Sequence, residues 1–182
     1  MRPAGSFLCR VGLSPNVVTL FSVILAAAAA IAFANRNLSL GLGFLVASVF
    51  VDMLDGSVAR ASGSAGTVGT LLDHTADRYS EFLYVFGLCY GGYAPFWLGM
   101  LCYFSMLMPS YVRAKAESSG AAASVQGVGI AERKEKLAIL IISAALALVW
   151  GDAVFYGLIV IVALSQISTF QRLHFASRST VI

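Results

Sequence analysis

Charged side chains are scarce in this sequence. Only 12% of its 182 residues are Asp, Glu, Lys or Arg, whereas 59% are hydrophobic, and the mean hydropathy is +0.84. That balance excludes an ordinary soluble domain and is typical of an integral membrane protein. A chain of this length has room for about six or seven spans of roughly 20 residues each, and none for a second, soluble domain. We therefore expect one all-α membrane domain.

Cysteine and histidine are equally sparse, which limits the redox and metal chemistry. Cys9, Cys89 and Cys102 are odd in number and lack the spacing of a metal site, so we interpret them as small apolar packing residues. His74 adjoins Asp73, and neighbouring residues of a helix point to different faces, so packing is favoured over ligation. The net charge of +3 is explained by basic residues on the cytoplasmic side rather than by binding to nucleic acid.

Six apolar segments, separated by turn-forming or charged residues, predict six transmembrane helices. We expect them at about residues 16–34, 38–59, 67–90, 96–116, 134–150 and 153–173. The sequence divides into an N-terminal segment, the six-helix domain and a cytoplasmic tail: residues 1–13, 14–176 and 177–182. The first of these mixes arginines with apolar side chains, as a short interfacial helix does.

The basic residues predict the orientation of these helices in the cell membrane. With both termini on one side, every Lys and Arg except Arg36 falls on or near that side. The positive-inside rule assigns that side to the cytoplasm. Nearly all the acidic residues fall there too, so we expect an active site that faces the cytoplasm.

Four aspartates stand out in this apolar chain. Asp52 and Asp55 are three residues apart, and Asp73 and Asp77 are four apart. Each pair shares one helix face if both segments are helical. Two such helices, joined by the Gly-rich stretch 60–69, would bring the four carboxylates together. Close carboxylates in a bilayer protonate unless a cation compensates them, and all-oxygen sites suit Mg²⁺, Mn²⁺ or Ca²⁺.

The residues from Asp52 to Asp77 match the pattern D-x2-D-G-x2-A-R-x8-G-x3-D-x3-D. This pattern resembles the signature of the CDP-alcohol phosphatidyltransferases, in which a CDP-activated lipid donates its phosphatidyl-type group to an alcohol and CMP is released. The resemblance implies Mg²⁺ or Mn²⁺, as two ions, held by four ligands: Asp52, Asp55, Asp73 and Asp77. It also implies that Asp77 is the general base on the acceptor hydroxyl.

The same resemblance implies a CDP site. The start of the first predicted helix, Leu13 to Thr19 (L-S-P-N-V-V-T), is similar to the corresponding segment of the family. It adds Asn16 and Thr19 to the residues of the motif. The implied contacts are Asn16, Thr19, Asp52, Gly56, Ala59, Arg60 and Gly69. The chemistry agrees, because glycines let a flat nucleotide approach the backbone and an arginine can pair with a phosphate.

A second basic cluster bears on the acceptor. Residues 110–117 (S-Y-V-R-A-K-A-E), 129–137 (G-I-A-E-R-K-E-K-L) and 171–174 (Q-R-L-H) resemble the phosphatidylinositol-phosphate or archaetidylinositol-phosphate synthase branch. That branch joins a CDP-lipid to inositol 1-phosphate. The resemblance implies an acceptor-phosphate pocket of Arg113, Lys115, Arg133, Lys136 and Arg172. Lys115 and Lys136 stand where arginine is more usual, and lysine is a point charge rather than a bidentate fork.

Several alternatives stay open. Glycerol 3-phosphate would need a similar anion pocket, and the basic cluster also fits simple topology with binding to anionic lipid head groups. A cation-coupled transporter would carry intramembrane carboxylates too, although its site would lie near the midplane between repeated halves, and no repeat is visible here. The donor lipid, diacyl or archaeal ether, leaves no motif signal. Ala26–Ala30 and Gly87-x3-Gly91 suggest a homodimer, unless these small residues pack helices within one subunit.

Overall fold

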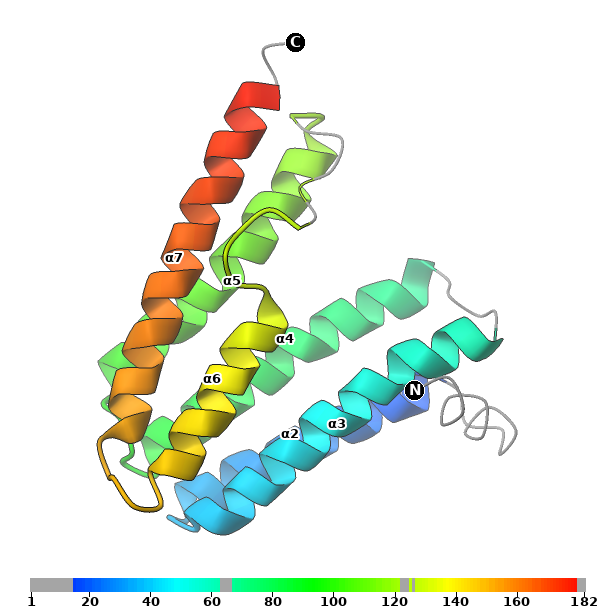
Figure 1. Ribbon diagram of the computed structural model, residues 1–182. Coiled ribbons are helices and arrows are strands. Elements are labelled where there is room, and N and C mark those ends of the chain that lie inside the picture. Colours follow the sequence, from blue (N-terminus) through cyan, green and yellow to red (C-terminus); the bar gives the residue numbers. More distant parts are fainter. Residues whose placement is uncertain (1–14, 63–66, 122–124, 126, 180–182) are drawn as a thin grey trace. The chain divides into compact units, whose positions relative to one another are not determined.

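The structure is a computed structural model that describes residues 15–62, 67–121, 125 and 127–179, with the backbone alone for residues 15, 54–62 and 67 (Figure 1). Every regular element in these ranges is an α-helix: α2 (Pro15–Ala34), α3 (Leu38–Ser62), α4 (Thr67–Tyr90), α5 (Phe96–Ser118), α6 (Arg133–Leu146) and α7 (Ala153–Ser179). The all-α prediction is confirmed, and each predicted segment contains a helix. The interfacial helix expected at residues 1–13 lies outside the described residues.

Three helices end three or more residues from their predicted positions. Helix α3 continues past Ala59 to Ser62, and α7 continues past Leu173 to Ser179, because neither Gly nor Pro interrupts them there. Helix α6 ends at Leu146 instead of reaching Trp150. The next residues turn more tightly, with N–H groups that bond to the carbonyl three residues back, for example Val149 to Leu146 at 3.0 Å. Apolar composition alone did not predict that change of winding.

Two stretches of the described helices are long and apolar enough to cross a bilayer, Asn16–Ala34 and Ala153–Ser179, and Leu38–Met53 is a shorter apolar segment. Both long stretches exceed the roughly 17 residues that a span needs. Acidic and basic side chains lower the hydropathy of helices such as α4. The count of six spans therefore stays a prediction.

The chain divides into two compact units, residues 1–92 and 93–182, and each is described by itself. In the first unit, α2 packs against both α3 and α4. In the second unit, α7 packs against both α5 and α6. The predicted metal and CDP residues belong to the first unit, and the predicted acceptor residues belong to the second.

Small residues bring α2 and α4 into close contact. A Cβ atom built on Gly87 would lie 2.6 Å from the Ala30 Cα, closer than real Cβ contacts come. Ala26, Ala29 and Ala30 are buried in the same unit. The small residues that suggested a homodimer therefore pack helices within one subunit, and they give no separate support for a dimer.

The turn between α2 and α3 is closed by backbone hydrogen bonds. The N–H of Asn37 donates to the Ala32 carbonyl, and the N–H of Arg36 donates to the Phe33 carbonyl, at 2.9 and 2.8 Å. This is the Schellman pattern, and it places Arg36 at a positive φ of 61°. The Asn37 side chain then caps α3 by accepting a hydrogen bond from the Leu40 N–H at 3.2 Å.

Candidate active site

A ladder of buried hydrogen bonds fixes the three helices of the first unit. The Tyr84 hydroxyl donates to the Ser48 Oγ at 2.7 Å, and the Ser48 hydroxyl donates to the Ser22 carbonyl at 2.6 Å. The Ser22 hydroxyl in turn donates to the Thr19 carbonyl at 2.7 Å. We call these residues, Ser22, Ser48 and Tyr84, the polar ladder. It joins α4 to α3 and α3 to α2 at one level of the unit.

The polar ladder helps to locate the predicted metal and CDP residues at one end of the first unit. Asp52 follows Ser48 by one helical turn on the same face, about 6 Å along the axis. Because α2 and α4 run against α3, the corresponding direction on them leads to earlier residues, toward Thr19 and Asp77. The start of α2, the end of α3 and the start of α4 therefore lie at the same end, as Figure 1 shows.

Two of the predicted metal ligands are held together on α4. Ligand atoms of Asp73, His74 and Asp77 all lie within 4.8 Å of one another. Asp77 is only 5% exposed and Asp73 is half-buried, whereas His74 is exposed. Two neighbouring carboxylates in a largely buried place repel each other unless a cation lies between them. The donor set and its spacing therefore fit a divalent ion such as Mg²⁺ or Mn²⁺.

The structure corrects the placement of His74. We expected its ring to point away from the aspartate pair, because it adjoins Asp73 in the chain. It is also three residues before Asp77, however, and residues three apart meet on one helix surface. The histidine can therefore reach the group, and the spacing to Asp77 was the signal that could have predicted it.

The predicted CDP contacts that the structure describes surround the same end. Asn16 and Gly69 are neighbours, since a Cβ built on Gly69 would lie 3.7 Å from the Asn16 Oδ1. Thr19 is buried one turn further along α2, and Asp52 is half-buried on α3. Asp52 does not belong to the group of ligand atoms formed by Asp73, His74 and Asp77. Gly69 lies inside helix α4 rather than in a loop, because α3 extends to Ser62 and α4 begins at Thr67.

Four predicted site residues fall outside the described side chains: Asp55, Gly56, Ala59 and Arg60. Their backbone belongs to the last part of α3. Both aspartate pairs therefore lie on helices, which confirms the condition on which their shared faces depended.

An ion pair beside Asp77 was missed in the sequence. The Arg78 Nη1 lies 2.9 Å from the Glu81 Oε2, and the Glu81 side chain is only 1% exposed. The two residues are three apart on α4, one turn from the aspartates. The pair carries no net charge, so it leaves the negative charges of Asp73 and Asp77 for a cation to balance. The spacing of Arg and Glu on one face was visible in the sequence, but its burial was not.

In the second unit, Arg172 of α7 is 6% exposed and joins two segments. Its Nη1 donates to the Pro109 carbonyl at 2.7 Å and its Nε donates to the Val128 carbonyl at 2.8 Å. Arg113 lies near enough for the positive charges of the two arginines to repel each other. The negative charges of Glu132 and Glu117 act on Arg172 as well. The two arginines can offer their remaining N–H donors to an anion.

Arg113 is tied to the end of α5. Its Nε donates to the Glu117 Oε1 at 3.2 Å, and the same oxygen accepts a hydrogen bond from the Val125 N–H at 3.0 Å. The Val125 hydrogen bond and the Arg113 guanidinium lower the pKa of Glu117, against the opposing effect of burial. A negative Glu117 therefore holds Arg113 by one edge and leaves its outer nitrogens for a ligand.

The other three predicted acceptor residues differ in exposure. Lys136 is buried on α6 and Arg133 is half-buried at the start of that helix. Lys115 is exposed, and its position two residues after Arg113 puts it on another face of α5. Within the second unit, the structure thus brings Arg113 and Arg172 together and turns Lys115 away from them.

The family model for CDP-alcohol phosphatidyltransferases matches residues 12–170 of the chain. An archaetidylinositol phosphate synthase of Methanothermobacter thermautotrophicus is 38% identical over 166 residues, covering 90% of this chain and 83% of that protein. The crystal structure of the phosphatidylinositol phosphate synthase of Mycobacterium tuberculosis, in complex with manganese and citrate, has a TM-score of 0.84 at 31% identity. It covers 96% of this chain and 87% of that one. The same enzyme with CDP-DAG bound also has a TM-score of 0.84 at 31% identity, covering 96% of this chain and 92% of that one.

Proposed function

The chain belongs to the CDP-alcohol phosphatidyltransferase family, and on that premise we propose that it transfers the lipid phosphate group of a CDP-activated lipid to inositol 1-phosphate. Family membership already decides against the transporter, so the chain is a membrane transferase of phospholipid biosynthesis. The observation that carries the proposal is the joint placement of Asp73 and Asp77 at the end where Asn16 and Gly69 meet. A metal-binding group and a nucleotide-binding edge then share one end of the first unit.

In this reaction the acceptor hydroxyl oxygen attacks the lipid-side phosphorus of the diphosphate. A new phosphorus–oxygen bond forms, the bond to CMP breaks, and the hydroxyl proton leaves to a base. We assign that base to Asp77, which is buried beside its partner Asp73. Two divalent ions, Mg²⁺ or Mn²⁺, would be held by Asp52, Asp55, Asp73 and Asp77, and would neutralise the diphosphate and the leaving CMP. The manganese in the mycobacterial relative supports a metal-dependent site of this kind.

The donor end of the site is assigned to residues of α2, α3 and α4. Asn16, Thr19 and Gly69 border the cytidine, together with Gly56 and Ala59, and Arg60 holds a phosphate. The CDP-DAG bound to the mycobacterial relative supports this assignment. The donor is a CDP-lipid of either chain chemistry, diacylglycerol or archaeol, since relatives of both kinds match.

The acceptor is assigned from the second unit. The positive charges of Arg113 and Arg172 lie near enough to repel each other, and a bound anion would relieve that repulsion. Hydrogen bonds to two backbone carbonyls hold Arg172 in place. An acceptor that already carries a phosphate suits this pair better than free inositol does. Arg133 and Lys136 complete the proposed pocket, and Lys115 contributes charge from the surface. The names of the archaeal and mycobacterial relatives favour inositol 1-phosphate over glycerol 3-phosphate.

The test is CMP release by the purified protein with CDP-diacylglycerol or CDP-archaeol and Mn²⁺ or Mg²⁺. Inositol 1-phosphate, free inositol, glycerol 3-phosphate and serine would be compared as acceptors. We expect release with inositol 1-phosphate, none in the presence of EDTA, and none from Asp77→Asn. Release with glycerol 3-phosphate alone would keep the transferase and replace the acceptor. Release by Asp77→Asn at the wild-type rate would overturn the assignment of the base.

We further propose six spans in the cell membrane, with both termini and the active site on the cytoplasmic side. The distribution of basic residues supports it, since Arg36 alone lies on the other side. A cysteine introduced at Arg36 and one introduced at Ser118 should react with a membrane-impermeant thiol reagent from opposite faces of sealed vesicles.

We also propose a homodimer. The mass of the protein in nanodiscs tests this proposal, because a single-subunit mass would count against a dimer.

A further inference from the structure

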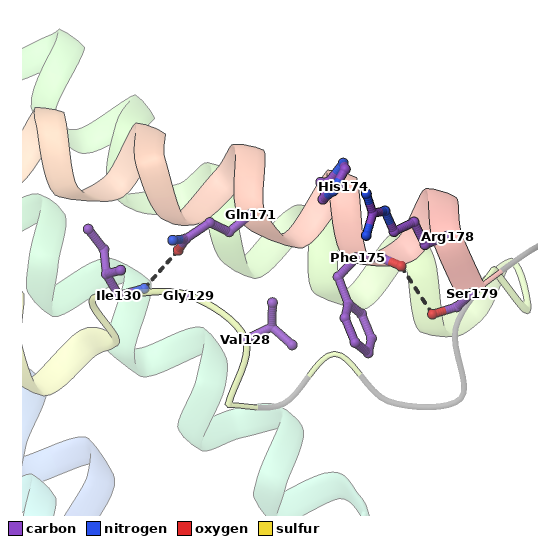
Figure 2. A pocket seen from close by; sticks show the side chains of 8 residues that line it. All are labelled: Val128, Gly129, Ile130, Gln171, His174, Phe175, Arg178 and Ser179. Atoms are coloured by element: carbon purple, nitrogen blue, oxygen red, sulfur yellow. Dashed lines mark hydrogen bonds between the residues drawn. The ribbon is translucent and has the colours of Figure 1, made fainter.

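A cavity of about 710 Å³ lies in the second unit, between the loop before α6 and the last turns of α7 (Figure 2). The loop supplies Val128, Gly129 and Ile130. Helix α7 supplies Gln171, His174, Phe175, Arg178 and Ser179. None of these residues is assigned to the transfer reaction. We call this cavity the α7 pocket.

Hydrogen bonds to α7 hold the loop wall of the α7 pocket in place. The Gln171 Oε1 accepts from the Ile130 N–H at 2.9 Å, and Figure 2 shows this contact as the dashed line between the two residues. The Ser168 Oγ accepts from the Ala131 N–H at 3.2 Å and donates to the Ala131 carbonyl at 3.3 Å. Arg172, one turn after Ser168 on α7, donates a further hydrogen bond to the Val128 carbonyl. The pocket is thus formed before any ligand arrives, which lowers the entropic cost of binding.

The lining combines an apolar interior with a basic edge. Val128, Ile130 and Phe175 provide apolar surface, and Phe175 points toward the loop in Figure 2. His174 and Arg178 are one turn apart and lie on one face of α7. Neither side chain makes a hydrogen bond or an ion pair within the described part of the chain. No acidic residue lines the pocket, so its charge is complementary to an anion.

The surroundings of the α7 pocket favour an amphiphile over a soluble anion. Helix α7 is one of the two apolar stretches long enough to span a bilayer. Its outer surface next to the pocket is apolar and exposed: Ile167, Phe170 and Leu173, with Phe170 68% exposed. A lipid chain can lie along that surface while its phosphate meets the basic edge at the end of the helix.

We propose that the α7 pocket binds an anionic phospholipid of the surrounding leaflet, separate from the donor lipid. Its phosphate pairs with Arg178 and His174, and the first part of its chains occupies the apolar interior beside Phe175. Such a lipid would hold the loop that carries Val128 against α7. It would therefore support the segment to which Arg172 is bonded without entering the reaction.

The experiment measures lipid binding by the full-length protein in mild detergent, without any CDP-lipid or acceptor. Native mass spectrometry would count bound phosphatidylglycerol and phosphatidylcholine over a titration of each. We expect phosphatidylglycerol to bind more tightly, and Arg178→Ala to weaken it by about fivefold, because one arginine near the surface contributes about that factor. His174→Ala should weaken it less. Lys134→Ala is the matched control, since it removes one exposed positive charge of the same unit outside the pocket.

Three results would overturn the proposal. Equal affinity for the two lipids would show that charge is not recognised. An equal loss in Arg178→Ala and Lys134→Ala would reduce the effect to net charge. Displacement of phosphatidylglycerol by millimolar glycerol 3-phosphate would show a phosphate site without lipid selectivity. Because no transfer reaction is measured, failure of the proposed acceptor would leave this result unchanged.

Discussion

Removing the Tyr84 hydroxyl should cost little stability, whereas removing the Ser48 hydroxyl should cost considerably more. Tyr84→Phe deletes one bond of 2.7 Å and keeps the buried ring, and Ser48 still donates to the Ser22 carbonyl. Single hydrogen bonds between membrane helices contribute about 0.6 kcal/mol on average and up to roughly 1.7 kcal/mol. We therefore expect Tyr84→Phe to lower the free energy of unfolding by about 1 kcal/mol.

Ser48→Ala acts on both bonds of the polar ladder at once. It deletes the acceptor that the Tyr84 hydroxyl uses and the donor that the Ser22 carbonyl uses. A buried polar group that loses its partner costs about 1–3 kcal/mol. We expect Ser48→Ala to cost about 2–3 kcal/mol, and the double variant with Tyr84→Phe to cost no more than Ser48→Ala alone. The two substitutions would then be coupled by about 1 kcal/mol.

The assay is reversible unfolding in mixed micelles, followed in parallel with Mn²⁺ binding by electron paramagnetic resonance. The polar ladder fixes the level of α3 against α2 and α4, so Ser48→Ala should also weaken Mn²⁺ binding at Asp73 and Asp77. Ser177→Ala is the control, because this exposed serine bonds only to the carbonyl of its own helix at His174. Additive losses in the double variant, within about 0.3 kcal/mol, would refute the coupling. Unchanged Mn²⁺ affinity in Ser48→Ala would show that the polar ladder stabilises the fold without positioning the metal ligands.

Three further predictions follow from close contacts. Gly87→Ala should lower the unfolding free energy by about 1–3 kcal/mol, since its new Cβ would meet the Ala30 backbone; thermal unfolding at the wild-type midpoint would contradict this. Arg172→Lys should lower stability and raise the acceptor KM, with little change in the CDP-lipid KM. The reason is that an ammonium group cannot reproduce the two directed hydrogen bonds of the guanidinium. Equal changes in both KM values would count against this prediction. Glu117→Gln should flatten the acid limb of the stability profile. Folding lowers the pKa of Glu117. Its charged carboxylate therefore stabilises the fold fully above pH 4.5, its ordinary pKa, and this stabilisation is lost as the pH falls through the lower pKa of the folded state. Parallel acid limbs in the variant and the wild type would refute the prediction.

The sequence predicted the helices well because turn signals bounded the apolar runs closely. Asn35-Arg36-Asn37 and Gly91-Gly92 interrupt the hydrophobic pattern where α2 and α4 end. It predicted the end of α6 poorly, since residues 147–150 are as apolar as the helix before them. Composition reports which residues avoid water, whereas the winding of the backbone depends on hydrogen bonds that composition does not encode.

For the candidate site, fixed spacing predicted the aspartate pairs, because a helix converts spacing into a shared face. The same rule, applied to His74 and Asp77, would have placed the histidine with them. The polar ladder could not have been predicted, since it joins serines and a tyrosine on three different helices. Contacts of that kind depend on which helices pack together, and the pattern along one helix does not contain this information.

The turn at Arg36 offers a route to a more robust protein. A non-glycine residue in the left-handed region costs about 1 kcal/mol or more, and Arg36 adopts it at the position where a Schellman turn usually has glycine. Arg36→Gly should therefore raise the midpoint of thermal unfolding by a few degrees. Arg36 is also the one basic residue expected on the outer side of the membrane, so the substitution would sharpen the charge asymmetry that orients the chain during insertion. A single substitution would thus favour correct insertion and raise stability together, at the opposite end of the first unit from its metal and CDP residues.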